Sequence, residues 1–262
     1  MKAEIIVITN QKGGVGKSTT AEAMAEGLLL QNNKVLLIDL DPQGSISLTA
    51  GFADTADDSK PNAYDLMMNK AISAQEVIQH HAHRVDIIPA GKNLAKLDIE
   101  LTSIGKDHRL KEKITPVLTE YDYIIIDTPP ALGILTINAL TAADSVLIPA
   151  QADLYSLQGI SQLYDTIGAV RTYTNQSLRI EGILLTRHNS RNILSRDMTD
   201  TARNTAAEMG TLLYDTVIRE CIALKEAQAS QQSIYEYAPK SNAATDYLSF
   251  VNEFIKRRDS HE

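Results

Sequence analysis

The chain has 262 residues, of which 44% are hydrophobic, so it is long enough to bury a large core. Its 25 Lys and Arg against 33 Asp and Glu give a net charge of −8, which argues against bulk affinity for nucleic acid but not against a local basic patch. One cysteine, Cys221, excludes a disulfide framework and suits a reducing cytosol, and no run approaches the roughly 18 apolar residues that span a membrane.

The first two predicted elements enclose a glycine-rich loop. Residues 4–9, EIIVIT, predict a buried strand, and residues 21–31 are rich in helix-forming Ala, Met, Leu and Glu. The glycines between them let backbone N–H groups turn toward an anion, and the positive end of the helix adds to the attraction. Lys17 supplies a full charge, and the Ser18 hydroxyl can bind Mg²⁺. A chance turn is the alternative, but the order strand, loop, helix predicts a phosphate-binding loop.

The loop, NQKGGVGKSTT, differs from a standard Walker A motif. Gln11 stands where that motif has its first glycine, and a second lysine, Lys12, directly precedes Gly13 and Gly14. This KGGxGK[ST] form resembles the deviant Walker A motif of the ParA/MinD ATPases. The resemblance implies that Lys12 reaches across a nucleotide-sandwiched dimer to the phosphates of the partner subunit. It also implies that ATP is bound by the loop residues Lys12, Gly13, Gly14, Val15, Gly16, Lys17, Ser18 and Thr19.

The second predicted strand ends in two carboxylates. Residues 34–39, KVLLID, form an apolar run that continues into DLDPQG. Side chains at the carboxyl end of a strand lie where open parallel sheets bind ligands. An Asp-Pro turn is the alternative interpretation. The DxDPQG sequence matches the switch I segment of the ParA/MinD family, and the resemblance implies that Asp41 orients the attacking water and helps to organise Mg²⁺.

The middle of the chain alternates short predicted elements with loops. His80, His81 and His83 cluster after a short helix, and we interpret them as a solvated helix end because no Cys or acidic residue stands at metal-ligand spacing. The sequence predicts a loop over 51–62, short helices over 63–70 and 73–79, a strand over 85–89, and a long helical stretch over 93–119 that is broken near Gly105 and Pro116.

A further predicted strand, YIIID over 123–127, also ends in an acid. It runs into Thr128, Pro129 and Pro130, and the prolines stop the strand and stiffen the following loop as a switch II segment. The pattern is Walker B-like, so Asp127 is expected to hold Mg²⁺ through water. A buried strand with a capping Asp is the alternative.

The remaining predicted elements continue the alternation of strand and helix. They are a helix over 134–142, a strand over 145–149, a helix over 157–173, a strand over 179–186, a helix over 193–208 and a final helix over 243–258. Such alternation predicts an α/β fold with a mostly parallel, doubly wound sheet flanked by helices. No Pro-, Gly- or Ser-rich linker divides the chain, so we expect one domain over residues 1–262.

Arginines gather after the strand predicted over 179–186, at Arg187, Arg191, Arg196 and Arg203. The ParA/Soj resemblance implies that this region contributes to the adenine pocket and to non-specific DNA contacts, and Arg191 best matches the family arginine. The alternative is a solvated helix face on which Arg196 pairs with Asp200.

A second stretch with a DNA-contact role in the family is changed in this chain. Residues 217–227, VIRECIALKEA, carry Glu220 and Ala223 at the positions of two family arginines, while Arg219 and Lys225 lie beside them and can substitute. The candidate DNA contacts are therefore Arg187, Arg191, Arg219 and Lys225. The last residues, 254–262, lack the apolar face of a membrane-binding helix, so we expect no stable membrane anchor.

The ParA/Soj resemblance covers nearly the whole chain. It implies an ATPase that uses ATP and Mg²⁺, forms a homodimer with ATP, binds double-stranded DNA non-specifically and leaves DNA when a ParB-like partner stimulates hydrolysis. Catalytic roles fall to Lys12, Lys17 and Asp41, and metal binding falls to Ser18, Asp41 and Asp127. Because the strand over 4–9 already meets the loop, we expect the short, Soj-like form without an N-terminal DNA-reading domain.

The expected process is plasmid or chromosome partitioning, and the expected location is the cytoplasm, in association with the nucleoid. Two alternatives stay open. One is a positioning ATPase of the same fold that acts on a membrane site or a protein cargo. The other is a small-molecule P-loop enzyme that forms an amide or transfers a phosphoryl group.

Overall fold

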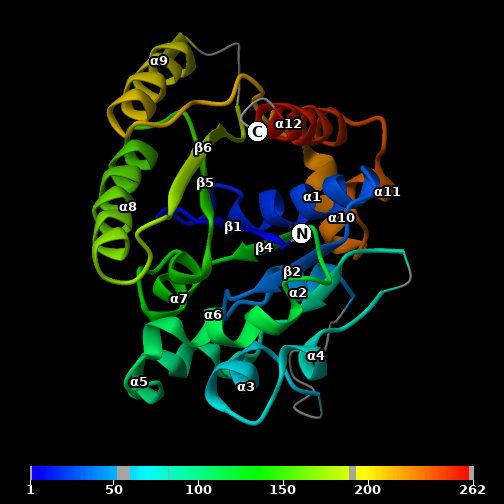
Figure 1. Cartoon of the computed structure of the whole chain (residues 1–262). Helices are drawn as coiled ribbons and strands as arrows, with labels where there is room; N and C mark the ends of the chain where they lie inside the picture. Colours follow the sequence, from blue (N-terminus) through cyan, green and yellow to red (C-terminus); the bar gives the residue numbers. More distant parts are fainter. Residues whose placement is uncertain (1, 52–59, 82, 189–192, 260–262) are drawn as a thin grey trace.

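The computed structural model describes residues 2–51, 60–81, 83–188 and 193–259 (Figure 1). Within these residues, six strands form one sheet in the order β3-β2-β4-β1-β5-β6, and every neighbouring pair is parallel. The strands are β1 (Glu4–Ile8), β2 (Val35–Asp39), β3 (Asp86–Ile88), β4 (Tyr123–Asp127), β5 (Ser145–Ala150) and β6 (Arg179–Leu185). The expected parallel α/β sheet is confirmed.

The strands read as unbroken apolar runs because both faces of the sheet are covered. In β1, Ile5 and Val7 belong to one core, and Ile6 and Ile8 belong to the other. The alternation continues in the neighbouring strand, where Ile125 lies on the face opposite to its two neighbours in β4. A strand that is apolar at every position therefore needs a layer of helices on each side.

Helices cover both faces of the sheet (Figure 1). One core is completed by α3 (Ala63–Met68), α4 (Ala74–Val77), α5 (Leu97–Glu100), α6 (Arg109–Ile114), α7 (Ile134–Ala142), α8 (Leu154–Tyr173) and the end of α9 (Ile193–Glu208). The other core is completed by α1 (Lys17–Leu30), α2 (Ser45–Thr49), α10 (Ile222–Ala229), α11 (Ile234–Tyr237) and α12 (Asn242–Asp259).

Helix α1 lies close against α12, which fixes the element that follows the glycine-rich loop. A Cβ atom on Gly27 would come within 2.8 Å of Val251 Cγ2 and 2.9 Å of Tyr235 Oη, so this contact needs a glycine. Phe250 and Phe254 of α12 are fully buried beneath it. The C-terminal helix thus holds α1 in place on the sheet.

The helical stretch expected over 93–119, with breaks near Gly105 and Pro116, is a series of short pieces. They are the 3₁₀ turn Lys92–Lys96, α5, the 3₁₀ turn Lys106–His108, α6 and the 3₁₀ turn Thr115–Val117. Gly105 has a φ of +78°, in the left-handed region, and Pro116 lacks the N–H that would continue a helix. Helix α1 also begins earlier than expected, at Lys17, because the loop closes directly into the helix.

Candidate nucleotide-binding site

The glycine-rich loop between β1 and α1 has the backbone that its glycines allow. Gly14 and Gly16 have φ values of +77° and +83°, in the left-handed region that other residues rarely adopt. Gly16 is the N-cap of α1, and the first turn of that helix carries no acidic side chain. The positive end of α1 therefore faces the space that the loop encloses, which favours an anion there.

The ends of β5 and β6 brace this loop from outside. The Thr186 hydroxyl donates to the carbonyl of Val15 over 2.7 Å, and the Asn10 side chain donates to the carbonyl of Pro149 over 2.7 Å. Asn10 Oδ1 in turn accepts the backbone N–H of Lys12 over 3.0 Å. The loop is thus held in shape by protein contacts rather than left for a ligand to organise.

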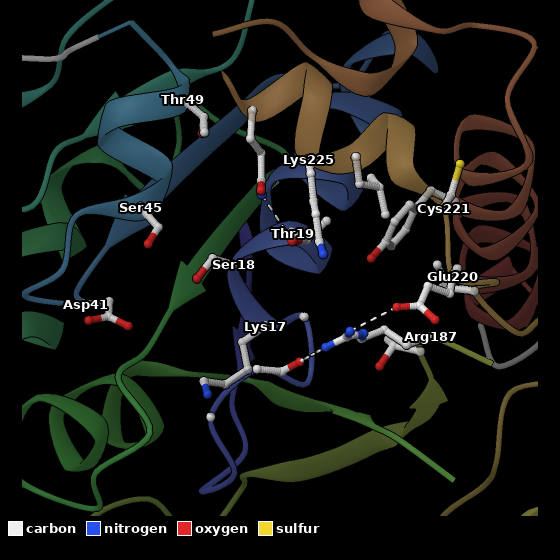
Figure 2. A pocket seen from close by; sticks show the side chains of 18 of the residues that line it. Lys17, Ser18, Thr19, Asp41, Ser45, Thr49, Arg187, Glu220, Cys221 and Lys225 are labelled. Carbon is white, nitrogen blue, oxygen red and sulfur yellow. Dashed lines mark hydrogen bonds and ion pairs between the residues drawn. The ribbon is translucent and has the colours of Figure 1, made fainter. Parts of the chain in front are cut away.

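A cavity of about 650 Å³ opens in front of the loop (Figure 2). Its floor is formed by Gly13, Gly14, Gly16, Lys17, Ser18 and Thr19. Lys17 is only 7% exposed, and its Nζ donates to the carbonyl of Lys12 over 3.1 Å. Burial lowers the pKa of Lys17, while Asp127 and Asp41 act to raise it. Six of the eight predicted loop residues therefore surround one space with Lys17 at its base, whereas Lys12 and Val15 do not line it.

Asp127 ends β4 directly behind the loop, as the Walker B-like pattern predicts. Both of its carboxylate oxygens are buried and lack a hydrogen-bond partner. Burial raises the pKa of Asp127 well above its usual value, and Asp39 adds to the rise. The Ser18 hydroxyl lies close enough to act to lower the pKa of Asp127, although it does not form a hydrogen bond with the carboxylate. A buried carboxylate without a hydrogen-bond partner, beside a serine hydroxyl, fits a site for Mg²⁺, which prefers hard oxygen ligands.

Asp41 lies at the side of the same cavity, after β2, and it is 9% exposed. Its Oδ1 accepts the backbone N–H of Gln43 over 2.9 Å. Its own N–H donates to Asp39 Oδ1 over 3.1 Å, and Asp39 Oδ2 accepts the Ser47 hydroxyl over 2.7 Å. Burial raises the pKa of Asp39 to about 6. Asp39 therefore ties the segment that carries Asp41 to the end of the strand.

Lys12 does not line the cavity, and its side chain turns toward the start of α8. Its Nζ donates to Asp153 Oδ2 over 2.6 Å and to the Ser156 hydroxyl over 3.2 Å. The same Asp153 caps α8 by accepting the Ser156 N–H. Lys12 thus has an ion-pair partner within its own chain, one that the loop motif alone does not reveal.

Three of the four candidate DNA contacts lie on the wall of this cavity, and Arg191 lies outside the described residues. Arg187 donates to the carbonyl of Gly14 over 3.3 Å and to Glu220 over 2.9 Å (Figure 2). Arg219 donates two hydrogen bonds to Asp246, from Nη2 to Oδ1 over 2.6 Å and from Nε to Oδ2 over 2.9 Å. Lys225 extends toward Thr19 in the same view. Their contact with DNA stays a prediction.

The far wall of the cavity includes residues that the sequence pattern did not single out. Ile218, Cys221 and Leu224 give it an apolar surface, and Gln228 donates to the Thr19 hydroxyl over 3.3 Å. These residues follow β6 by more than thirty positions. No strand-end motif marks them, so only the fold brings them to the loop. A flat apolar wall beside a phosphate-binding loop is suited to a nucleotide base.

The other candidate features of the sequence have local partners. His80 pairs with Asp86 over 2.9 Å, and no group of three His, Cys, Asp or Glu suited to a metal occurs among the residues described. At the C-terminal helix, Arg257 pairs with Glu253 and Asp215, and Arg258 pairs with Glu181 and Glu4. Within the described part of the chain, no helix is long and apolar enough to cross a membrane.

Fold and cavity together define a P-loop nucleotide-binding protein with a parallel α/β sheet. Residues 3–180 match the family described as AAA domain. The sporulation initiation inhibitor protein Soj of Bacillus subtilis is 40% identical over 251 residues, which cover 95% of this chain and 97% of Soj. The chain therefore belongs to the ParA/Soj family of P-loop ATPases.

Two solved structures share the fold across nearly the whole chain. A plasmid partition protein of Borrelia burgdorferi bound to AMPPNP has a TM-score of 0.80 at 27% identity, covering 98% of this chain and 100% of that chain. A cobyrinic acid a,c-diamide synthase of Mycobacterium smegmatis with bound ADP and magnesium has a TM-score of 0.83 at 28% identity, covering 99% and 97%. Both are nucleotide-bound, in agreement with the class that the cavity defines.

Proposed function

We propose that this chain is an ATP-dependent DNA-partitioning ATPase whose ATP-bound dimer binds DNA non-specifically. The observation that carries the proposal is the placement of the two lysines of the loop. Lys17 lies at the base of the cavity, whereas Lys12 lies outside it and is held by Asp153. One lysine therefore serves the nucleotide of its own chain, and the other is available for the nucleotide of a partner subunit.

Within the cavity, each residue has a separate part in ATP hydrolysis. The loop N–H groups and Lys17 bind the phosphates. Ser18 and Asp127 would hold Mg²⁺, with Asp41 nearby, and the metal would neutralise charge that develops on the phosphates. Asp41 orients the attacking water. Its Oδ1 already accepts the N–H of Gln43, so we assign Oδ2 to the water.

Dimer formation requires Lys12 to exchange its partner. Lys12 must leave Asp153 before its Nζ can reach the phosphates of a second subunit. The side chains of this pair are 27% and 34% exposed, so water screens the pair and little energy opposes the exchange. The doubly charged terminal phosphate of the second subunit's nucleotide then replaces the single carboxylate of Asp153 as the partner of Lys12.

DNA binding would follow from pairing two weak patches. Arg187, Arg191, Arg219 and Lys225 are the contacts we propose, and the exposed ion pair between Arg187 and Glu220 can open at little cost. Two patches on one dimer raise the effective concentration at the DNA without new contacts. Hydrolysis, stimulated by a ParB-like partner with a short basic segment, separates the subunits and releases the DNA. We place this cycle in the cytoplasm, on the nucleoid.

The oligomeric state of the protein tests the proposed roles of Lys12 and Asp41. In sedimentation experiments with ATP and Mg²⁺, the wild-type protein is expected to dimerise. Lys12→Ala should bind ATP, because the cavity of its own chain is intact. It should stay monomeric, because no lysine reaches the nucleotide of the partner subunit. Asp41→Ala should dimerise and persist as a dimer, because the water is no longer oriented. Normal dimers of Lys12→Ala would contradict the cross-subunit role, and a wild-type hydrolysis rate in Asp41→Ala would contradict the assignment of Asp41.

A small-molecule enzyme is the second candidate, because one of the similar structures is named a diamide synthase. ATP turnover distinguishes the two. Acceleration by DNA together with a partner protein supports partitioning. Acceleration by a small carboxylic acid with an amide donor, and not by DNA, supports amide formation.

A further inference from the structure

A cluster of buried charges lies behind the nucleotide cavity, between α1 and α2. Glu22 and Glu26 stand one turn apart on α1, and their side chains are 12% and 8% exposed. Arg84, which precedes β3, is 7% exposed and donates to both: its Nη2 reaches Glu22 Oε1 over 3.1 Å and its Nε reaches Glu26 Oε1 over 2.8 Å. Two buried carboxylates on one helix require such a cation, since an unpaired buried charge is strongly destabilising.

The same guanidinium also contacts α2, the short helix of the switch I segment. Arg84 Nη1 donates to the backbone carbonyl of Thr49 over 3.2 Å, and the Thr49 hydroxyl donates to Glu22 Oε1 over 3.1 Å. Thr49 is the last residue of α2 and lines the nucleotide cavity (Figure 2). The cluster therefore fastens the end of α2 to the helix whose first turn carries Lys17 and Ser18.

The segment from Asp41 to Thr49 is thus held by two side chains, Asp39 and Arg84. Asp39 accepts the N–H of Asp41 at the start of the segment and both the N–H and the hydroxyl of Ser47 near its end. At its end, Arg84 holds Thr49. Between these points the chain turns at Gly44, whose φ is +60°. Without Arg84, Asp39 still anchors the segment at Asp41 and Ser47, but the end of α2 loses its contact at Thr49 and is tied less firmly to α1.

We propose that Arg84 is a positioning residue for ATP hydrolysis, which acts through Thr49 and Glu22 to fix the switch I segment that carries Asp41. This inference rests on the proposed function. Arg84 does not touch the cavity, so phosphate binding by the loop does not depend on it. The orientation of the water by Asp41 does, and a small misplacement of a catalytic group can slow a reaction by about a hundredfold.

The charge on Glu22 gives the arrangement a pH dependence that can be measured. Burial raises the pKa of Glu22 to about 7, Arg84 and the Thr49 hydrogen bond oppose the rise, and Glu26 adds to it. The other groups that face this cluster are Tyr247 of α12 and Tyr235 and Glu236 of α11. As the pH falls through about 7, Glu22 loses its charge and attracts Arg84 less, so the anchor of α2 weakens.

The test compares three variants with the wild type: Arg84→Met, Glu22→Gln and, as a matched control, Arg258→Met. Arg258 pairs with Glu181 and with Glu4, the first residue of β1, away from the cavity, so its substitution also breaks an ion-pair cluster of one arginine with two glutamates. The measurements are kcat by phosphate release, Kd for ATP with Mg²⁺ by nucleotide fluorescence, and Tm, between about pH 6 and pH 8.

Arg84→Met is expected to lose about tenfold to a hundredfold in kcat with Kd unchanged, while Arg258→Met keeps the wild-type kcat. Wild-type kcat should fall from high to low pH, and Glu22→Gln should flatten this profile because its amide oxygen still accepts both hydrogen bonds and does not titrate. A wild-type kcat in folded Arg84→Met, or an equal loss of ATP affinity, would overturn the proposal.

If Arg84→Met does not fold, Glu22→Gln decides, because a pH profile identical to the wild type would also overturn the role of the cluster. A wild-type protein that binds ATP without turning it over gives a different result. It contradicts the proposed ATPase function itself, and the positioning role falls with it.

Discussion

Asp127 is the side chain on which the proposed metal binding most depends. Its carboxylate is buried at the end of β4, without a hydrogen-bond partner, and next to Asp39. Two buried acids side by side destabilise each other when both are ionised, which is why burial and the neighbour raise the pKa of Asp127. A divalent cation removes this repulsion. We therefore propose that Asp127 destabilises the empty site and favours the binding of Mg²⁺ there.

Asp127→Asn should abolish the Mg²⁺-dependent part of stabilisation by ATP, since the neutral amide has no charge for the metal to balance. In the wild type, ligand at about a hundredfold excess over its Kd raises the free energy of unfolding by about 3 kcal/mol. Thermal melts with ATP plus Mg²⁺ and with ATP plus EDTA measure the difference. Asp122→Asn, at an exposed position just before the same strand, is the control. A variant that retains the full Mg²⁺ effect would show that Asp127 does not hold the metal.

At the scale of elements, the start of α8 decides where Lys12 points. Asp153 caps this helix and also binds Lys12. Burial acts to raise the pKa of Asp153, but the hydrogen bonds from Lys12 and Ser156 outweigh it and lower the pKa. The cap and the ion pair can be separated, because Asn caps helices about as well as Asp does but carries no charge.

Asp153→Asn is expected to shift ATP-dependent dimerisation to a several-fold lower protein concentration, because Lys12 is released from its own chain while α8 stays capped. An ion pair of this exposure contributes up to about 1 kcal/mol, which corresponds to about fivefold in an equilibrium constant. Sedimentation at graded protein concentrations checks this, with Asp165→Asn at an exposed position of α8 as the control. Weaker dimers in Asp153→Asn alone would mean that Asp153 supports the interface instead.

Element boundaries show what the sequence could and could not predict. The bounds of β4 and α7 were predicted to the residue, since the apolar run of β4 ends at Asp127 and that of α7 begins after Gly133. The stretch over 93–119 was predicted as helical with breaks near Gly105 and Pro116, and both breaks are present. The helical pieces are shorter than expected, because 3₁₀ turns replace α-helix at three places. Periodicity reports the residues that tend toward a helix and gives little information on where tertiary contacts interrupt it.

The residues of the site also divide into those that the sequence predicts and those that it does not. Lys17, Ser18, Asp41 and Asp127 could be placed together because parallel strands deliver their carboxyl ends to one edge. The pairing of Lys12 with Asp153 and the cluster around Arg84 could not, because each joins residues far apart in sequence through contacts that carry no motif. Glu22 and Glu26 of α1 were noted only as helix-forming residues, and the structure buries both.

Across the whole molecule, the arrangement of charge leads us to expect that a single subunit binds DNA weakly. The net charge is −8, and Arg187, Arg219, Arg257 and Arg258 are each engaged with a carboxylate of the same chain. Each such carboxylate repels a DNA phosphate. Gated binding therefore needs an event that pairs subunits, and the nucleotide that binds between Lys12 and the loop of a partner supplies it in the proposed cycle.

Nucleotide-gated DNA binding is tested most directly by measuring the binding of the purified protein to random-sequence duplex DNA at one fixed, moderate salt concentration. The arms are no nucleotide, ADP, and ATP with Mg²⁺. We predict binding with ATP alone, weakened steeply by added salt because phosphate contacts release counterions. Equal binding in all three arms would contradict nucleotide gating. Absence of binding in every arm would contradict DNA as the cargo. It would indicate that this chain, which has Glu220 in place of a family arginine, acts on a partner of another kind.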